Sequence, residues 1–437
     1  MSADLLERLV AGRLRDPERG EIVTVPTRAV TIAPSLRGHE AALVESIGLG
    51  RRLAIIADPA TWEALGARIS GALAAHFAVT PVILPDRPHA DIATVHRIRA
   101  LTPIAEALIA VGSGTINDLA KYAAFLDGKP YACFGTAPSM NGYTSVNAAI
   151  MEDGVKKSLP AAAARGVFLD IGVLAKAPPR MIAAGFGDSI CRPTAQADWL
   201  LSHLLLDTAY RALPFTLLTE DEDALLAAPE GLAASNGAAM TRLARLLVMS
   251  GFGMTICGGS YPASQGEHLI AHFMEMRGDP ARDRFHGEQI AVTTLTMARI
   301  QSEALRMTQP RLNAPQATVG TFSSFYGPEV GAVCWENFAG KMLSGERLAK
   351  VNARLERQWP EIRATIRAVH RDVQVLESAL RRCAAPTRPG DLGLSDETYR
   401  EAVLHAREIR NRTTFLDFAA DTGCLNRVVD ATLVPAQ

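Results

Sequence analysis

Three of the ten histidines lie within residues 266–288, in the segment GEHLIAHFMEMRGDPARDRFHGE. His268 and His272 are four residues apart, so on a helix their side chains share one face. His286 follows a charged, proline-containing break and begins a second helical segment. Neutral imidazole is a ligand of zinc, nickel and iron, so this cluster indicates either a metal site or the polar surface of a solvated helix.

The spacing of these histidines does not match that of a zinc protease. In the H-E-x-x-H motif a glutamate follows the first histidine and acts as the general base. Leu269 and Ile270 follow His268 here, so that glutamate is missing. A metal with three protein ligands keeps one position open, and in that position it could polarise a carbonyl group.

A carboxylate ligand must come from another part of the chain, and the segment AAGFGDSICRP contains Asp188. Glycines on both sides of Phe186 predict that another backbone segment approaches closely here. Asp188, His268 and His286 are therefore the candidate ligands. The alternative is that Asp188 caps a helix and that the histidines are surface residues.

A glycine-containing turn, VGSGTIND (111–118), follows an apolar strand and begins a helix. Free N–H groups at such a helix N-terminus can bind a pyrophosphate, and small residues allow the backbone to approach it. The spacing is G-x-G, with Asn117 at the third position of the dinucleotide fingerprint, so an ordinary strand–helix turn is the alternative. Asp58 ends an earlier strand, where its carboxylate could bind a ribose diol, cap the helix that begins at Pro59, or do both.

The elements that must position these residues change in character along the chain. Strand and helix patterns alternate up to about residue 178, with strands at 51–58, 79–85, the start of 106–126, and the start of 129–140. This alternation predicts parallel βαβ units, whereas the later segments have helical periodicity. We predict an α/β fold with an N-terminal, Rossmann-like, parallel-sheet domain that binds a nucleotide (1–178). An all-helical C-terminal domain that binds metal and substrate (179–437) follows it.

Composition narrows the class of protein. The formal net charge of −1 gives no electrostatic basis for binding nucleic acid or an anionic membrane. The six cysteines are scattered without a C-x-x-C pair, which suits a reducing compartment. The sequence has no apolar core of a signal peptide and no apolar run of about 20 residues. We therefore expect a cytoplasmic protein that does not associate with membranes.

Several segments, in order, resemble the sn-glycerol-1-phosphate dehydrogenase family. That family falls within a wider group of glycerol dehydrogenases, iron-containing alcohol dehydrogenases and dehydroquinate synthase-like proteins. The matching segments are VGSGTINDLAKYAA, FGTAPSMNGYTSVNAAI, AGFGDSICRPTAQADW, SGFGMTICGGSYPASQGEHLIAHF and HGEQIAVTTL. The late segment YREAVLHAREIRNRTTFLDFAAD is similar to the C-terminal helices of the family. The resemblance covers most of the chain and implies a dehydroquinate synthase-like fold.

The resemblance also implies an activity and a metal site. The reaction would be the metal-dependent, NAD(P)H-linked reduction of dihydroxyacetone phosphate to sn-glycerol 1-phosphate, or of a related small ketone, in phospholipid metabolism. Asp188, His268 and His286 would bind one divalent metal, zinc in the first place and otherwise nickel or iron. His272 would contact the substrate, which makes it the fourth catalytic residue. Relatives imply a homodimer or a larger homo-oligomer.

The nicotinamide cofactor would bind to three parts of the N-terminal domain. Asp58 would hold the adenosine ribose, and its charge beside a 2′-phosphate would favour NAD over NADP. The residues implied for the pyrophosphate are Gly112, Ser113, Gly114, Thr115 and Ile116. The residues implied for the nicotinamide side are Thr136, Ala137, Pro138, Ser139 and Ser145.

Two positions depart from the pattern of the wider group. Iron-type relatives have a fourth ligand, a histidine one turn after the aspartate, where this chain has Arg192. Arg192 therefore argues against a four-ligand iron site. Its guanidinium would either bind a phosphate or form a salt bridge on the helix surface. Asn141 replaces a substrate-contacting aspartate of the family and cannot accept a proton. Either His272 or water then carries the proton, or the substrate differs.

Two other functions remain compatible with the sequence. A dehydroquinate synthase-like cyclase would also use NAD and a metal, but it would recycle its nicotinamide without net turnover. A catalytically degenerate protein that binds a nucleotide or sugar phosphate is the other alternative, and Asn141 is the residue that supports it.

Overall fold

The computed structural model describes residues 2–152, 155–277 and 284–433. The chain forms two compact units and enters each of them more than once. Unit 1 comprises Met1–Ser189, Ala212–Gly259 and Arg382–Ala385, and unit 2 comprises Ile190–Arg211, Ser260–Arg381 and Pro386–Gln437. The proline-containing break expected before His286 falls on residues 278–283, outside the described residues.

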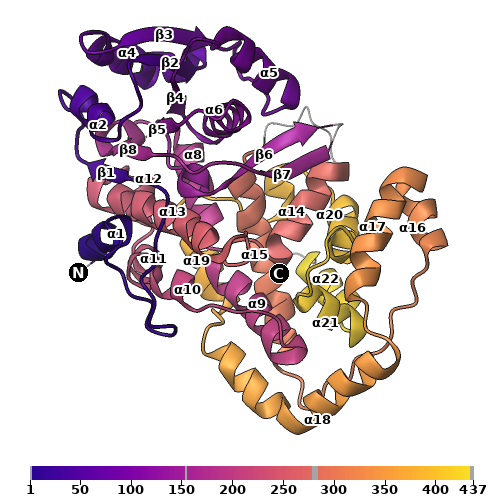
Figure 1. The fold of residues 1–437 in the computed structure, drawn as a ribbon. Helices are drawn as coiled ribbons and strands as arrows, with labels where there is room; N and C mark the ends of the chain where they lie inside the picture. Colours follow the sequence, from indigo (N-terminus) through magenta and orange to yellow (C-terminus); the bar gives the residue numbers. More distant parts are fainter. Residues whose placement is uncertain (1, 153–154, 278–283, 434–437) are drawn as a thin grey trace. The chain divides into compact units, whose positions relative to one another are not determined.

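A six-stranded parallel sheet lies at the centre of unit 1 (Figure 1). Its strands are, in spatial order, β1 (Ala29–Ala33), β8 (Gly166–Asp170), β5 (Tyr131–Gly135), β4 (Ala107–Gly112), β2 (Arg52–Ala57) and β3 (Ala78–Ile83). After β2 the chain passes to the edge strand β3 and returns to β4 on the other side of β2. The topological switch point therefore lies between β2 and β4, where α/β proteins of this kind bind ligands. The expected Rossmann-like sheet is confirmed.

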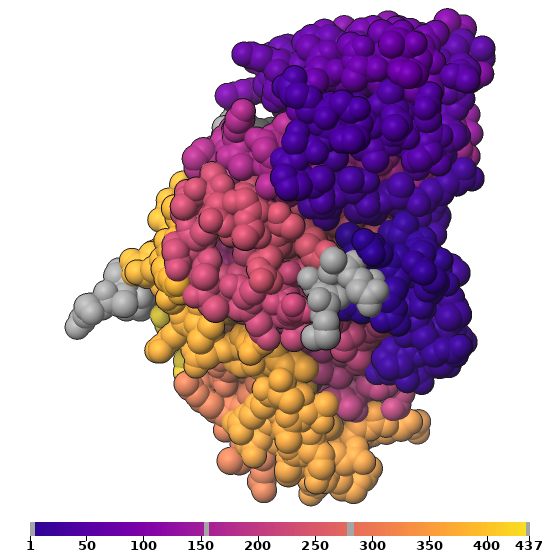
Figure 2. All heavy atoms as spheres, turned by 90° about the vertical axis from the view of Figure 1, so that its left-hand side faces the viewer, coloured from indigo at the N-terminus to yellow at the C-terminus, as the bar shows by residue number. Residues whose placement is uncertain are grey.

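Helices cover both faces of this sheet, which explains why its central strands are apolar throughout. Every residue of β4, β5 and β8 is buried, as is typical of parallel strands inside a three-layer domain. Figure 1 shows α5 (Ile92–Leu101) and α6 (Gly114–Leu126) on one side, and α2 (Glu40–Ser46) and α4 (Ala67–Ala74) on the other. Helix α1 (Ser2–Val10) lies at the surface on the face drawn in Figure 2.

Shorter elements complete unit 1. An antiparallel hairpin joins β6 (Asn147–Glu152) to β7 (Val155–Pro160). The other helical segments are α3 (Pro59–Thr61), η1 (Trp62–Gly66), η2 (Gly142–Thr144), α7 (Ile171–Leu174), α8 (Pro179–Ser189), α10 (Leu213–Thr216), α11 (Thr219–Ala227), α12 (Glu230–Ala233) and α13 (Gly237–Cys257).

The packing does not divide at residue 178, where the sequence pattern changes. From α8 onward the described elements are helical, yet α8 and α10–α13 pack in the same unit as the sheet. Hydrogen bonds to η2 explain this: Thr144 Oγ1 donates to Val248 O at 2.6 Å, and Thr255 Oγ1 donates to Thr144 O at 2.9 Å. Gly251 allows the contact, because an added Cβ would lie 2.2 Å from Thr144 Oγ1.

All regular secondary-structure elements among the described residues of unit 2 are helices. Its helices are α9 (Arg192–Leu206), α14 (Gly266–Arg277), α15 (His286–Ala304), α16 (Val319–Tyr326), α17 (Pro328–Lys341), α18 (Gly345–Arg367), α19 (Val373–Arg382), η3 (Pro389–Leu392), α20 (Asp396–His405), η4 (Ala406–Glu408), α21 (Phe415–Asp421) and α22 (Leu425–Leu433). The core gathers apolar side chains of α9, α14, α15, α18 and α21. Among the helices that the structure describes, none has both the length and the apolarity needed to cross a membrane.

Candidate functional site

The three segments predicted to bind the cofactor follow neighbouring strands of the sheet. β4 ends at Gly112 and β5 at Gly135, and these two residues are paired in the parallel register. Thr136 N donates a hydrogen bond to Gly112 O at 3.1 Å, so the two loops leave the sheet side by side. Asp58 follows β2, and β2 pairs with β4 on the side opposite β5. Unit 1 therefore brings all three segments to the carboxyl edge of the sheet, at its switch point.

The turn between β4 and α6 requires glycine at its first position. An added Cβ on Gly112 would lie 2.5 Å from Ile116 Cβ, which is closer than real side chains approach. Asn117, which stands where the dinucleotide fingerprint has its third glycine, is fully buried. Its side-chain amide donates to Asp118 Oδ1 at 3.1 Å and to Gly142 O at 3.4 Å. Asn117 therefore ties the start of α6 to the loop that contains η2.

Asp58 is a helix cap. Its Oδ1 accepts a hydrogen bond from Thr61 N at 2.8 Å, and Asp58 N donates to Thr61 Oγ1 at 3.0 Å. Pro59 occupies the first helical position, where its missing N–H has no cost. The cap that the sequence predicted is confirmed, and the contact of Asp58 with a ribose stays a prediction.

The loop after β5 packs directly against α8. An added Cβ on Gly185 would lie 1.6 Å from Pro138 O and 3.2 Å from Ser139 Cα. The close backbone approach that the glycines around Phe186 predicted is therefore confirmed at Gly185. The same loop is fixed from within unit 1 by Tyr143, whose hydroxyl donates to Ala137 O at 2.6 Å.

A buried lysine organises the loop between β5 and β6, and the sequence analysis did not identify it. Lys121 Nζ donates to Gly142 O at 2.7 Å, Asn147 O at 2.9 Å and Ser145 Oγ at 3.1 Å. Burial lowers the pKa of Lys121, and the nearby carboxylate of Asp118 opposes this shift. Ser145, a predicted cofactor residue, is thus held by Lys121 at a fixed position.

Asn141 lies beside Asp188, the candidate carboxylate ligand. Asp188 is buried in α8 with 2% of its surface exposed, and its Oδ2 accepts a hydrogen bond from Asn141 N at 3.0 Å. The side-chain amide of Asn141 donates to Ser250 Oγ on α13 at 3.3 Å. Unit 1 therefore places the residue that departs from the family pattern next to the candidate ligand.

The three histidines converge within unit 2. His268 and His272 lie on α14, and His286 begins α15. Ring centroids are 5.2 Å apart for His268 and His286, 5.9 Å for His268 and His272, and 6.1 Å for His272 and His286. His268 is 5% exposed, so the alternative of a solvated helix surface is wrong for this residue.

A carboxylate supports His268 from behind. Glu267 is fully buried, and its Oε1 lies 3.0 Å from His268 Nδ1. Gln265 N donates to Oε1 at 2.7 Å, and Thr194 Oγ1 donates to Oε2 at 3.3 Å. A carboxylate in this position favours a proton on Nδ1, so that Nε2 carries the lone pair that binds a metal. Sequence reasoning missed Glu267, although a glutamate directly before a candidate ligand is a usable signal.

A second carboxylate accompanies the second candidate ligand. Glu275 Oε1 lies 3.6 Å from His286 Nδ1 and accepts a hydrogen bond from Gln289 Nε2 at 3.4 Å. Histidines that bind metals commonly have such a partner for their other ring nitrogen. Both histidines therefore have the surroundings of metal ligands.

His272 has different surroundings. Burial lowers the pKa of His272 well below its ordinary value; Glu275 opposes this shift, and the charge of Arg410 adds to it. The imidazole is therefore neutral at physiological pH. Its Nδ1 is enclosed and has no hydrogen-bond partner among the residues that the structure describes. An enclosed polar atom without a partner fits a residue that contacts a bound ligand.

Another group of potential ligands within unit 2 does not fit a metal. Cys191, Glu267 and His268 have ligand-type atoms within 4.8 Å of one another. However, both oxygens of Glu267 accept hydrogen bonds, and the thiol of Cys191 donates to Ala263 O at 3.8 Å. A thiol that donates a hydrogen bond is protonated, whereas a metal binds the thiolate. Glu267 therefore positions His268 and is not itself a ligand.

Arg192, which replaces the fourth histidine of iron-type relatives, begins α9. It is 8% exposed, so it does not lie on the helix surface as one interpretation of the sequence expected. Its guanidinium donates to Gln196 Oε1, one turn further along the helix, at 3.3 Å.

Comparison with known proteins identifies relatives of this chain. Residues 31–178 match the family model described as iron-containing alcohol dehydrogenase. A glycerol-1-phosphate dehydrogenase (NAD(P)+) from Bacillus licheniformis is 28% identical over 86% of this chain and 84% of the relative. The enzymes of that name from Halalkalibacterium halodurans and Thermococcus kodakarensis are 30% and 31% identical. They match 71% and 66% of this chain, over 70% and 82% of their own lengths.

Solved structures show the same fold. Glycerol dehydrogenase from Schizosaccharomyces pombe superposes with a TM-score of 0.62 at 16% identity, covering 93% of this chain and 90% of that one. A sulfoacetaldehyde reductase from Bifidobacterium kashiwanohense, solved with NAD+, has a TM-score of 0.61 at 14% identity, covering 94% and 98%. A Rossmann-like sheet followed by a helical C-terminal part thus defines the class of iron-containing alcohol dehydrogenases and dehydroquinate synthase-like proteins.

Within that class, the chain belongs to the glycerol-1-phosphate dehydrogenase family. It is therefore a dehydrogenase that acts on a CH–OH group.

Proposed function

We propose that the protein reduces dihydroxyacetone phosphate to sn-glycerol 1-phosphate with a nicotinamide cofactor and one divalent metal. The convergence of His268, His272 and His286 in unit 2 is the observation that carries this proposal. Membership of the family supports the cofactor and the substrate class. The free cysteines support a place in the cytoplasm. A homodimer or larger homo-oligomer, tested by light scattering, completes the proposal.

Asp188, His268 and His286 are the proposed metal ligands. The donor set fits a divalent metal, because two imidazoles have carboxylates beside their Nδ1 atoms and the third ligand is a buried carboxylate. Zinc is the first choice, and nickel or iron would also suit these donors. When bound, the metal would polarise the ketone and stabilise negative charge on its oxygen.

The residues of unit 1 would bind the cofactor at the carboxyl edge of the sheet. The turn from Gly112 to Ile116 would hold the pyrophosphate at the N-terminus of α6. The loop from Thr136 to Ser139, together with Ser145, would line the nicotinamide. Asp58 would accept hydrogen bonds from the ribose while it caps α3.

The proton in this reaction must come from a group other than Asn141. A bound reduced nicotinamide would supply the hydride for the new C–H bond, and the former ketone oxygen would take a proton. An amide cannot exchange that proton, whereas neutral His272 can donate an N–H hydrogen bond to the substrate. We assign His272 to substrate contact and proton transfer, and Asn141 to a hydrogen bond with a substrate hydroxyl.

Steady consumption of NADH with dihydroxyacetone phosphate tests the reaction. The product should not be oxidised by an sn-glycerol-3-phosphate dehydrogenase, because it is the opposite enantiomer. Net turnover separates a dehydrogenase from a cyclase, which recycles its cofactor. Dialysis against a chelator should abolish activity, and measured metal content should fall in a His268→Ala variant. A metal-free wild type that folds and reduces no ketone would overturn the proposal.

The proposed preference for NAD has its own test. Asp58→Asn removes the charge but keeps a good helix cap, so stability should change little. The variant should raise the specificity constant for NADPH relative to NADH. An unchanged ratio, with wild-type stability, would show that Asp58 acts only as a cap.

A further inference from the structure

A buried carboxylate of unit 2 binds the start of α14, the helix of His268 and His272. Asp198 lies on α9 and has no exposed surface. Its Oδ2 accepts a hydrogen bond from Gly266 N at 2.9 Å, and its Oδ1 accepts one from Phe415 N at 3.0 Å. Gly266 is the first residue of α14, and Phe415 is the first residue of α21. The first N–H groups of a helix have no acceptor within the helix, so this one carboxylate supplies an acceptor to two helices.

The start of α14 fits closely against this carboxylate. An added Cβ on Gly266 would lie 2.8 Å from Asp198 Oδ2 and 2.4 Å from Met297 Cε. His268 follows Gly266 by two residues, within the same helical turn. A displacement of the first turn of α14 would therefore displace His268 as well.

A second route connects Asp198 with His268 through side chains. Gln301 on α15 donates from Nε2 to Asp198 Oδ1 at 3.1 Å and to Thr194 O at 2.9 Å. The hydroxyl of Thr194 donates to Glu267, the carboxylate that supports the His268 ring. All of these side chains except that of His268 are at most 1% exposed. The backbone of α14 and this network therefore both link Asp198 to a proposed metal ligand.

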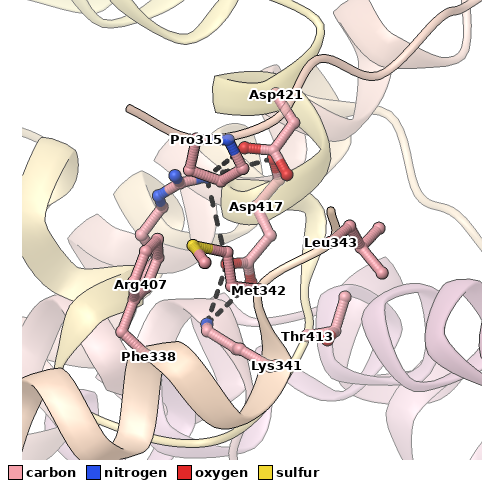
Figure 3. Close-up of a pocket in the computed structure, with 9 residues that line it drawn as sticks. All are labelled: Pro315, Phe338, Lys341, Met342, Leu343, Arg407, Thr413, Asp417 and Asp421. Carbon is pink, nitrogen blue, oxygen red and sulfur yellow. Dashed lines mark hydrogen bonds and ion pairs between the residues drawn. The ribbon is translucent and has the colours of Figure 1, made fainter. Parts of the chain in front are cut away.

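Helix α21, which supplies the third donor to Asp198, is itself fixed by two buried ion pairs (Figure 3). Lys341 pairs with Asp417 in the first turn of α21, and Arg407 pairs with Asp421 in the last turn, both at 2.8 Å. The cavity that these residues line has a volume of about 10 Å³, which accommodates a single water at most. The network therefore leaves no room for a substrate, and it makes α21 a firm support for Asp198.

We propose that Asp198 is a positioning residue for metal binding, which fixes the start of α14 and thereby the orientation of His268. This inference rests on the metal of the proposed function. A ligand side chain binds a metal well only if its own surroundings hold it in the right orientation. Asp198 would act through Gly266 and Glu267, and it is not itself a ligand.

Zinc affinity, measured in competition with a chelator, tests this role. The titrations are made at about pH 9, because burial raises the pKa of Asp198 to about 8 and the wild-type carboxylate is then ionised. Asp198→Asn keeps the shape of the side chain but has a single acceptor oxygen, so at least one of the three N–H groups loses its partner. This variant should raise the Kd for zinc about tenfold, and Asp198→Ala, which removes every acceptor, by up to about 100-fold. If Asp198→Ala does not fold, Asp198→Asn decides alone, and a Kd within about threefold of the wild type overturns the inference.

Asp421→Asn is the matched control. Asp421 is also buried in unit 2, and the substitution breaks its ion pair with Arg407 at the far end of α21. Among the described residues, Asp421 shares no hydrogen-bond partner with Asp198 or Glu267. The control should therefore lower the free energy of unfolding but leave the Kd for zinc within about threefold. An equal rise of the Kd in Asp421→Asn would show that lost stability alone weakens zinc binding, and the inference would be wrong.

Hydrogen exchange in the metal-free protein separates this inference from the proposed function. Peptides that cover residues 264–270 should exchange faster in Asp198→Asn than in the wild type, and Asp421→Asn should leave them unchanged. If the wild type binds no zinc but this difference is seen, Asp198 still fixes the start of α14 and the proposed metal fails. If the wild type binds zinc and reduces dihydroxyacetone phosphate, but Asp198→Asn matches Asp421→Asn in exchange and in affinity, the inference on Asp198 is wrong.

Discussion

Gly185→Ala tests the contact between α8 and the loop that we assign to the nicotinamide. The added Cβ would lie 1.6 Å from Pro138 O, whereas a carbon and a carbonyl oxygen in contact need about 3.3 Å. The backbone segments must therefore separate by roughly 1.7 Å, and a carbonyl oxygen cannot rotate away as a flexible side chain can. Overpacking of this kind costs about 1–3 kcal/mol, and we expect the upper end of that range.

Gly71→Ala is the matched control for this substitution. Gly71 also lies in a helix, α4, but no heavy atom outside its own helical surroundings lies within 4 Å of the added Cβ. Alanine should stabilise that helix by about 0.5–1 kcal/mol. Because both variants add one methyl group to a helical glycine, opposite changes in the free energy of unfolding would isolate the packing contact. Denaturant unfolding of both variants measures this difference.

The same displacement should weaken cofactor binding. A shift of about 1 Å in a positioning segment can reduce rates by about 100-fold, so we expect the KM for NADH to rise by one to two orders of magnitude. The KM should change far less in Gly71→Ala. A Gly185→Ala protein that unfolds at the wild-type denaturant concentration, or that binds NADH as tightly as the wild type, would refute the reasoning.

Three further predictions concern buried polar residues. Burial raises the pKa of Asp198 to about 8, and the charge of Glu267 adds to it, so stability should fall as pH rises from about 4 to 8. Asp198→Asn should flatten this slope, by up to about 1.4 kcal/mol per pH unit in denaturant unfolding, and an unchanged slope would contradict the pKa. Lys121→Met should cost about 3 kcal/mol or more, because it removes three buried hydrogen bonds to the loop and leaves the Asp118 carboxylate without its ion-pair partner; a smaller loss in thermal unfolding would show that the loop relaxes. Asn141→Asp should change the pH dependence of kcat, since it adds a carboxylate near Asp188; an identical profile would show that a carboxylate at position 141 does not reach the site of proton transfer.

The sheet could be predicted where the signal is local. The apolar run at 51–58 corresponds to β2, and the run before the glycine turn corresponds to β4. Each of these strands is buried on both faces, so the sequence shows a short, continuous apolar segment between turn residues. β1 has only partly buried residues and lies at the edge, and its pattern is correspondingly weak.

The allocation of helices to the two units could not be predicted. Nothing in the sequence of α13 distinguishes a helix that packs near the sheet from one that packs among other helices. The deciding contacts are hydrogen bonds of Thr144 with residues more than 100 positions later. Contacts of this kind form only after the chain has folded, and periodicity does not encode them.

In the candidate site, too, some features could be predicted from the sequence and others could not. The shared face of His268 and His272 follows from their spacing on one helix, and the structure confirms it. Lys121, by contrast, lies in a helix whose sequence resembles that of any surface helix, and its burial depends on carbonyl groups of the loop after β5.

The buried lysine of unit 1 has a structural role. An ammonium group has three donors, and those of Lys121 have acceptors in Gly142, Asn147 and Ser145. Lys121 therefore needs no ligand, and it stabilises its loop whether or not the cofactor is bound.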